Sequence, residues 1–123
     1  MSKNIKVKWL NESEEQNYPA VESFLSLIYD VQTATKYVRQ LRRAAISEFK
    51  AKDIFRASGL FLLGISNSHV EKDRKKILEG NKLSPILPVR DKKNSRVIIA
   101  DGNHRMCAVY SFDEDAVIPC NIV

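Results

Sequence analysis

The sequence predicts an α/β (α+β) domain in which helices pack on a small mixed sheet. Apolar residues recur at helical spacing through the N-terminal half, residues 11–58, which is typical of amphipathic helices that face a core. The β-branched run 96–100 is the clearest strand and leads through Asp101 and Gly102 into a helical segment. A last apolar run, 117–123, follows that segment. Such elements bury their apolar faces by stacking helices on a sheet.

In the N-terminal half, a short edge strand over residues 5–10 precedes three predicted helices. The first helix begins near Pro19, and its inward residues are Val21, Phe24, Leu25 and Ile28. The second repeats this spacing with Val31, Ala34, Val38, Leu41 and Ala45. The third is predicted over residues 48–58, with Ile54 and Phe55 inward. It ends at Gly59, because glycine readily adopts the conformation of a helix C-cap.

The sequence pattern in the middle of the chain predicts an apolar segment followed by a fourth helix. Residues 60–65 form a short apolar run, which fits either a buried strand or an irregular core segment. Asn67 or Ser68 caps the next helix, which stops at Gly80. With His69, this helix start is also a second possible anion site, although capping alone explains the residues.

The C-terminal part, residues 65–123, is richer in predicted strands. After the fourth helix, its elements are the strand 86–90, the turn 91–95, the strand 96–100, the helix 103–112 and the strand 117–123. Pro88 cannot donate a backbone hydrogen bond, so it places the first of these strands at an edge or beside a bulge.

Length and composition favour one cytoplasmic domain spanning residues 1–123. A chain of 123 residues is long enough for one core. No apolar run approaches the roughly 20 residues of a membrane span, and the N-terminus lacks the apolar stretch of a secretory signal. Cys107 and Cys120 are the two cysteines, which predicts reduced thiols rather than a disulfide framework.

The net charge of +5 favours polyanionic partners. Much of the excess lies in one segment, whose basic residues are Lys36, Arg39, Arg42, Arg43, Lys50, Lys52 and Arg56. One interpretation is a solvated helix face. The other is a surface that binds nucleic acid through its phosphates, although the aromatic residues nearby lie at core-like spacings rather than as a base-stacking platform.

Residues 101–105, Asp-Gly-Asn-His-Arg, form a turn into a helix that is suited to holding a phosphate group. Gly102 allows a sharp turn and the close approach of a ligand, and the first amides of a helix have no intrahelical acceptor. Arg105, which we expect to be partly exposed, adds a bidentate fork, and His104 can exchange a proton near neutral pH. Asp101 is expected to cap the helix, ligate magnesium or orient the histidine. The alternative is an ordinary turn with solvated side chains.

Residues 97–105, with Ala108 and 118–120, resemble the core of the ParB/sulfiredoxin-like superfamily, and so do residues 83–90. In ParB proteins a strand containing leucine, proline and isoleucine precedes a strand that ends in Gly-Glu-Arg-Arg and opens a helix. A following strand begins with isoleucine and proline. The match covers residues 65–123. The chain looks most like the uncharacterised bacterial ParB-like proteins, which are often labelled nucleases, but it has no carboxylate cluster of the kind that two-metal nucleases need.

The resemblance implies a bound nucleoside triphosphate, ATP or CTP, with Mg²⁺, and a phosphotransferase or NTPase activity. Asp101 and His104 would be the catalytic residues, and Asp101 would hold the metal. The residues expected to contact the nucleotide are Gly102, Asn103, His104, Arg105, Lys82 and Ser84.

Departures from the family pattern narrow these expectations. Sulfiredoxins carry a reactive cysteine where this chain has Asn103, so we expect no sulfinic-acid reduction. Partition proteins have Glu-Arg-Arg at residues 103–105 and append DNA-binding and dimerisation domains, for which 123 residues leave no room. The competing hypothesis is a non-catalytic module that binds nucleic acid or protein through the basic helices 31–56. A metal site built from His69, His104, Cys107 and Cys120 is weak, because no Cys-x-x-Cys pair supports it.

Overall fold

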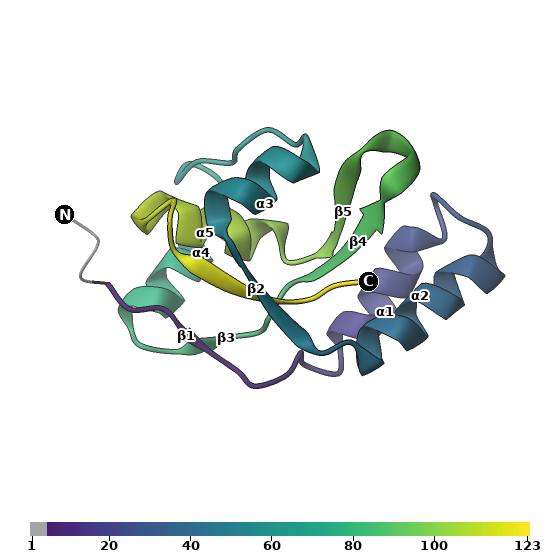
Figure 1. Ribbon diagram of the computed structural model, residues 1–123. Helices are drawn as coiled ribbons and strands as arrows, with labels where there is room; N and C mark the ends of the chain where they lie inside the picture. The colour runs from purple at the N-terminus through teal and green to yellow at the C-terminus, as the bar shows by residue number, and fades with distance from the viewer. Residues whose placement is uncertain (1–4) are drawn as a thin grey trace.

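The computed structural model describes residues 5–123 and confirms the predicted mixed α/β class (Figure 1). Within these residues the helices are α1 (Asn17–Leu25), α2 (Val31–Arg43), α3 (Ala51–Ser58), α4 (Ser68–Leu78) and α5 (Asn103–Phe112). The strands are β1 (Lys8–Trp9), β2 (Ile46–Lys50), β3 (Lys82–Leu83), β4 (Leu87–Asp91), β5 (Arg96–Asp101) and β6 (Val117–Asn121). None of the helices in this part of the chain combines the length and hydrophobicity that a membrane crossing requires.

The strands pair in small ladders, and β4 with the residue before it joins two of them, β2–β6 and β4–β5. The β2–β6 and β4–β5 pairs are antiparallel, and the β1–β3 pair is parallel. The amide of Ile86 donates to the carbonyl of Pro119 at 3.2 Å, and the amide of Arg90 donates to the carbonyl of Val123 at 2.7 Å. Since the Ile86–Cys120 bridge is parallel, the β2–β6 and β4–β5 pairs lie side by side with mixed strand directions.

Two apolar clusters cover the two faces of the β4–β5 hairpin. Alternating residues of the hairpin pack against α1 and α2: Leu87, Val89, Ile98 and Ala100. Ile86 and Ile99 belong to the other cluster, which α3, α4, α5 and β6 complete. Side chains of successive strand residues point to opposite faces, so this hairpin contributes to both clusters, and α5 packs in the second of them.

The predicted helix over residues 48–58 is wrong at its start. Residues Ile46–Lys50 form β2, and helix α3 begins only at Ala51. Strand β2 pairs along its whole length with β6, from Ile46 opposite Asn121 to Lys50 opposite Val117. This long-range pairing outweighs the local helical pattern, which is the usual way in which context overrides propensity.

Residues 60–65 are neither a buried strand nor a core segment, so both alternatives predicted for them are wrong. They form no regular structure, and Phe61 is 93% exposed. Only Leu63 packs partly against the core. The inward faces predicted for the first two helices are also partly wrong, because Phe24, Ile28 and Val31 are exposed.

The elements around residues 101–105 agree with the predictions. Strand β4 has a bulge between Leu87 and Pro88, β5 is followed by α5, and β6 comes next. Helix α4 begins after Asn67, whose side chain accepts hydrogen bonds from the amides of His69 and Val70.

Candidate functional site

Gly102 forms the turn between β5 and α5 and is the N-cap residue of α5. Its φ angle of +106° lies in the left-handed region that favours glycine. A Cβ atom at this position would lie 2.5 Å from Cγ2 of Ile86 and 2.8 Å from Nη2 of Arg105. The glycine is therefore required by packing within the protein, and the space beside it is filled by these two side chains rather than left for a ligand.

The first-turn amides of α5 differ from those of α2, α3 and α4. The side chains of Asp30 and Asn67 cap α2 and α4. The first two amides of α3 donate to the carbonyl groups of Ala116 and Glu114. Within residues 5–123, the amides of residues 103–105 have no acceptor, and Gly102 supplies no side-chain cap. Helix α5 thus begins with unbonded donors, and the positive end of its dipole adds to them.

Arg105 is more engaged with the protein than we expected from the sequence. Its Nη2 atom donates to Oδ2 of Asp101 at 2.9 Å and to the carbonyl of Pro85 at 3.2 Å. Its side chain is 17% exposed. Its Nε atom is buried and has no hydrogen-bond partner in the described part of the chain. Arg105 therefore ties the end of β5 and the segment before β4 to the start of α5, and Nε is left as a donor.

Asp101 ends β5, as predicted, and its carboxylate contacts the guanidinium of Arg105. No group of three or more His, Cys, Asp or Glu side chains suited to a metal ion occurs among residues 5–123. A magnesium ion here would have Asp101 as its protein carboxylate, and phosphate and water would have to supply the other ligands. The side chains fit a phosphate better than a metal held by protein alone.

His104 lies next to a second histidine from another helix. The ring centroids of His69 and His104 are 4.9 Å apart, and the ring planes are inclined by 38°. Each histidine belongs to the first turn of its helix, α4 or α5, so the starts of the two helices come together. Oδ1 of the neighbouring Asn103 is buried and lacks a partner among the described residues. The sequence indicated both helix starts but not their meeting, which depends on how α4 packs against α5.

Lys82 and Ser84 occupy different environments. Ser84 is buried, and its hydroxyl accepts hydrogen bonds from the amide of Glu14 at 3.1 Å and from Nδ2 of Asn17 at 2.9 Å. This hydroxyl holds the segment before α1 in place. Lys82 is exposed and pairs in register with Lys8 in the β1–β3 ladder. Neither side chain has a hydrogen bond or ion pair to residues 101–105.

Both thiols belong to the core. Cys107 and Cys120 are free and buried. Burial raises the pKa of Cys120 to about 12, and burial also raises the pKa of Cys107, against a smaller opposing effect of a hydrogen bond with the backbone of Leu63. Protonated thiols are poor nucleophiles and metal ligands, which weakens the metal site that the sequence offered as an alternative.

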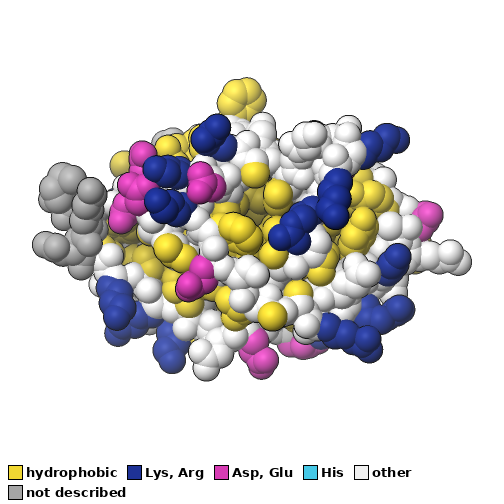
Figure 2. All heavy atoms as spheres, viewed as in Figure 1, with side chains coloured by type: hydrophobic (Ala, Val, Ile, Leu, Met, Phe, Trp, Pro, Cys, Tyr) yellow, Lys and Arg dark blue, Asp and Glu magenta, His cyan; other side chains and the backbone are white. Residues whose placement is uncertain are grey.

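The basic segment is divided between several elements. Arg42 pairs with Glu15, and its guanidinium lies 4.2 Å above the ring of Tyr18. Lys52 pairs with Asp115 at 2.7 Å. The exposed basic residues of α2 that have no ion pair within the described chain are Lys36, Arg39 and Arg43. Figure 2 shows basic side chains both at the margins of this face and beside a central apolar hollow.

No family model, curated protein or solved structure matches the chain. The resemblance to the ParB/sulfiredoxin-like superfamily therefore stays a prediction, and the site is interpreted from its own geometry.

Proposed function

We propose that this protein binds the phosphate groups of a nucleotide, ATP or CTP, at the N-terminus of α5. The observation that carries the proposal is the set of unbonded amides at residues 103–105. Backbone amides at a helix start bind anions well, because they point at the ligand and the helix dipole favours negative charge. The dipole contributes only about 0.3–1 kcal/mol at an exposed site, so the side chains must supply much of the affinity.

The side chains around α5 have distinct roles in this proposal. His104 and His69 donate to phosphate oxygens from two helix starts, which is consistent with their ring contact. Arg105 contributes its charge and its unpartnered Nε, while Asp101 holds the guanidinium in position through Nη2. The amide of Asn103 is the first donor of the turn. Lys82 and Ser84 are not assigned contacts, since the Ser84 hydroxyl is bonded to Glu14 and Asn17 and Lys82 belongs to the separate β1–β3 ladder.

Phosphate transfer or hydrolysis is the finer expectation, and Asp101 would be the residue that holds Mg²⁺. The metal would neutralise charge on the phosphates. His104 is the side chain of residues 101–105 to which we assign proton transfer. Nucleotide binding must precede either reaction, and it can be measured whether or not a reaction follows.

A thermal-unfolding screen of nucleoside di- and triphosphates, with and without Mg²⁺, tests the proposal. At a nucleotide concentration about 100 times Kd, binding to the folded state alone should stabilise it by about 2.7 kcal/mol. His104→Ala should weaken the affinity about two- to tenfold, because it removes one hydrogen bond to phosphate. The matching nucleosides, which lack phosphate, are the control and should have no effect. No stabilisation of the wild-type protein by any nucleotide would rule out the proposal and favour the nucleic-acid- or protein-binding module.

A further inference from the structure

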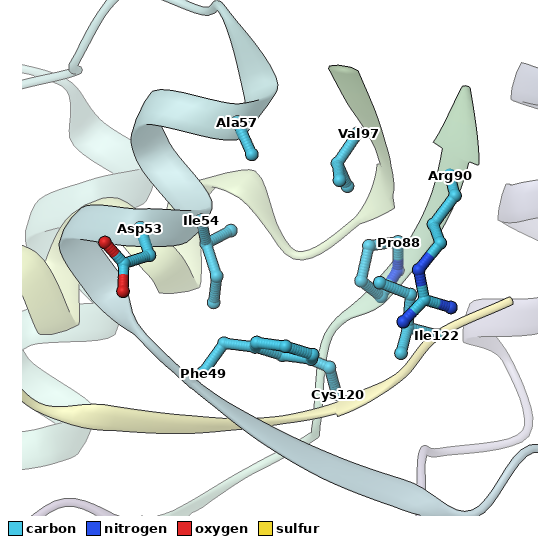
Figure 3. Close-up of a pocket in the computed structure, with 9 residues that line it drawn as sticks. All are labelled: Phe49, Asp53, Ile54, Ala57, Pro88, Arg90, Val97, Cys120 and Ile122. Carbon is cyan, nitrogen blue, oxygen red and sulfur yellow. The ribbon is translucent and has the colours of Figure 1, made fainter. Parts of the chain in front are cut away.

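A second site lies away from α5, between α3, the β2–β6 pair and the β4–β5 hairpin. It is a cavity of about 210 Å³ that none of residues 101–105 lines. Its apolar walls are Phe49, Ile54, Pro88, Val97, Cys120 and Ile122. Figure 2 shows the corresponding apolar hollow on the surface, and Figure 3 shows the side chains that enclose it.

The walls reach the core, so the cavity is part of the fold rather than a shallow surface depression. Ile54 is 6% exposed, and Cys120 and Pro88 are fully buried. Cys120 and Ile122 lie two residues apart and share one side of their segment by strand alternation. Phe49 of β2 closes the cavity at its more exposed side. Empty apolar space of this kind readily accepts an apolar group.

Two charged side chains lie at opposite sides of the cavity. Figure 3 shows the guanidinium of Arg90 on the side of Ile122 and Pro88, and the carboxylate of Asp53 on the side of α3. No carboxylate of residues 5–123 forms an ion pair with Arg90. An unpaired guanidinium beside apolar walls matches a ligand with a carboxylate at one end, since arginine binds carboxylates through two parallel hydrogen bonds.

We propose that this cavity binds a small apolar monocarboxylate, with its chain against Ile54 and its carboxylate on Arg90. The volume is below the roughly 300–1,000 Å³ of sites for drug-sized ligands, which favours a short chain over a larger molecule. The far end is lined by the apolar side chains of Ile54 and Ala57 from α3, where an ionised carboxylate would lose its hydration without gaining a cationic partner, which disfavours a second carboxylate there. The ligand class is therefore a monocarboxylate of about six carbons, such as hexanoate, rather than a dicarboxylate.

A titration with hexanoate, followed by methyl and amide NMR of the full chain, tests this site. Methyl signals of Ile54, Val97 and Ile122 should shift, with a Kd on the order of 1 mM for so small a ligand. Arg90→Gln should weaken binding about tenfold. Arg39→Gln is the matched control, because it makes the same change at an exposed arginine of α2 and should leave the affinity unchanged. Ala57→Leu, which fills the cavity from α3, should also reduce binding.

The ligand series identifies which feature is recognised. Hexanol, which lacks the charge, and adipate, which carries a second carboxylate, should both bind several-fold more weakly than hexanoate. The proposal is overturned if hexanoate leaves the cavity methyls unshifted, if Arg90→Gln keeps the wild-type affinity, or if hexanol or adipate binds as tightly as hexanoate. Nucleotide binding at α5 is measured separately, so the two proposals can fail independently.

Discussion

Gly102→Ala is expected to lower the free energy of unfolding by about 3 kcal/mol. A left-handed conformation costs a residue with a Cβ atom about 1–2 kcal/mol. The new atom would also lie 2.5 Å from Cγ2 of Ile86, and overpacking of this kind costs about 1–3 kcal/mol. Ile86 is fully buried, so it has little room to move away. Chemical denaturation of the wild-type protein and the variant measures the difference.

Gly59→Ala is the matched control for this prediction. Gly59 also has a positive φ, +68°, but a Cβ atom there would meet nothing within 4 Å. Its substitution should cost about 1 kcal/mol, from backbone strain alone. In an Ile86→Ala background the nearest colliding atom, Cγ2, is absent, although the Cβ atom of residue 86 still lies 2.8 Å from the added atom, so Gly102→Ala should lose part of its cost. Equal losses for Gly102→Ala and Gly59→Ala would show that packing against Ile86 contributes nothing.

Arg105→Ala is expected to weaken phosphate binding about ten- to a hundredfold, because a charge-assisted hydrogen bond contributes about 1.5–3 kcal/mol. It should also destabilise the fold by about 1–3 kcal/mol, since the carboxylate of Asp101 and the carbonyl of Pro85 lose their donor. Isothermal titration with the best nucleotide, at a temperature where circular dichroism shows the variant to be folded, separates the two effects.

Two further substitutions complete the Arg105 measurement. Arg105→Lys keeps a positive charge but cannot reproduce the planar guanidinium, so it should recover only part of the affinity. Arg39→Ala removes an exposed arginine of α2 and should leave nucleotide affinity unchanged. Wild-type affinity in the folded Arg105→Ala variant would contradict the role assigned to this residue and leave it with its structural contacts alone.

Local patterns were sufficient to predict the elements that surround residues 101–105. The β-branched run 96–100 predicted β5, and the Asp-Gly pair predicted the turn, because each signal acts over a few neighbouring residues. Asn67 predicted the start of α4 for the same reason, since its side chain bonds amides two and three residues ahead. Residues 46–50 could not be assigned in this way, because they are a strand only by pairing with β6.

The contacts within the site depended on residues far apart in the sequence. The bond from Arg105 to the carbonyl of Pro85 and the approach of Ile86 to Gly102 join the segment before β4 to the turn and helix that follow β5. The meeting of His69 and His104 depends on helix packing. No local pattern encodes such distances, so the sequence indicated which residues carry charge and donors but not how Arg105 is held.

An NMR titration of the backbone amides with ATP, CTP and inorganic phosphate tests the phosphate site most directly. We expect the largest shifts at residues 103–105, whose amides have no acceptor in the described chain. The amides of Ala51 and Lys52 are the internal control, because they already donate to the carbonyls of Ala116 and Glu114 at 2.9 Å, and they should shift little. Unshifted amides at 103–105, with the changes confined to the basic residues of α2, would contradict the proposed site.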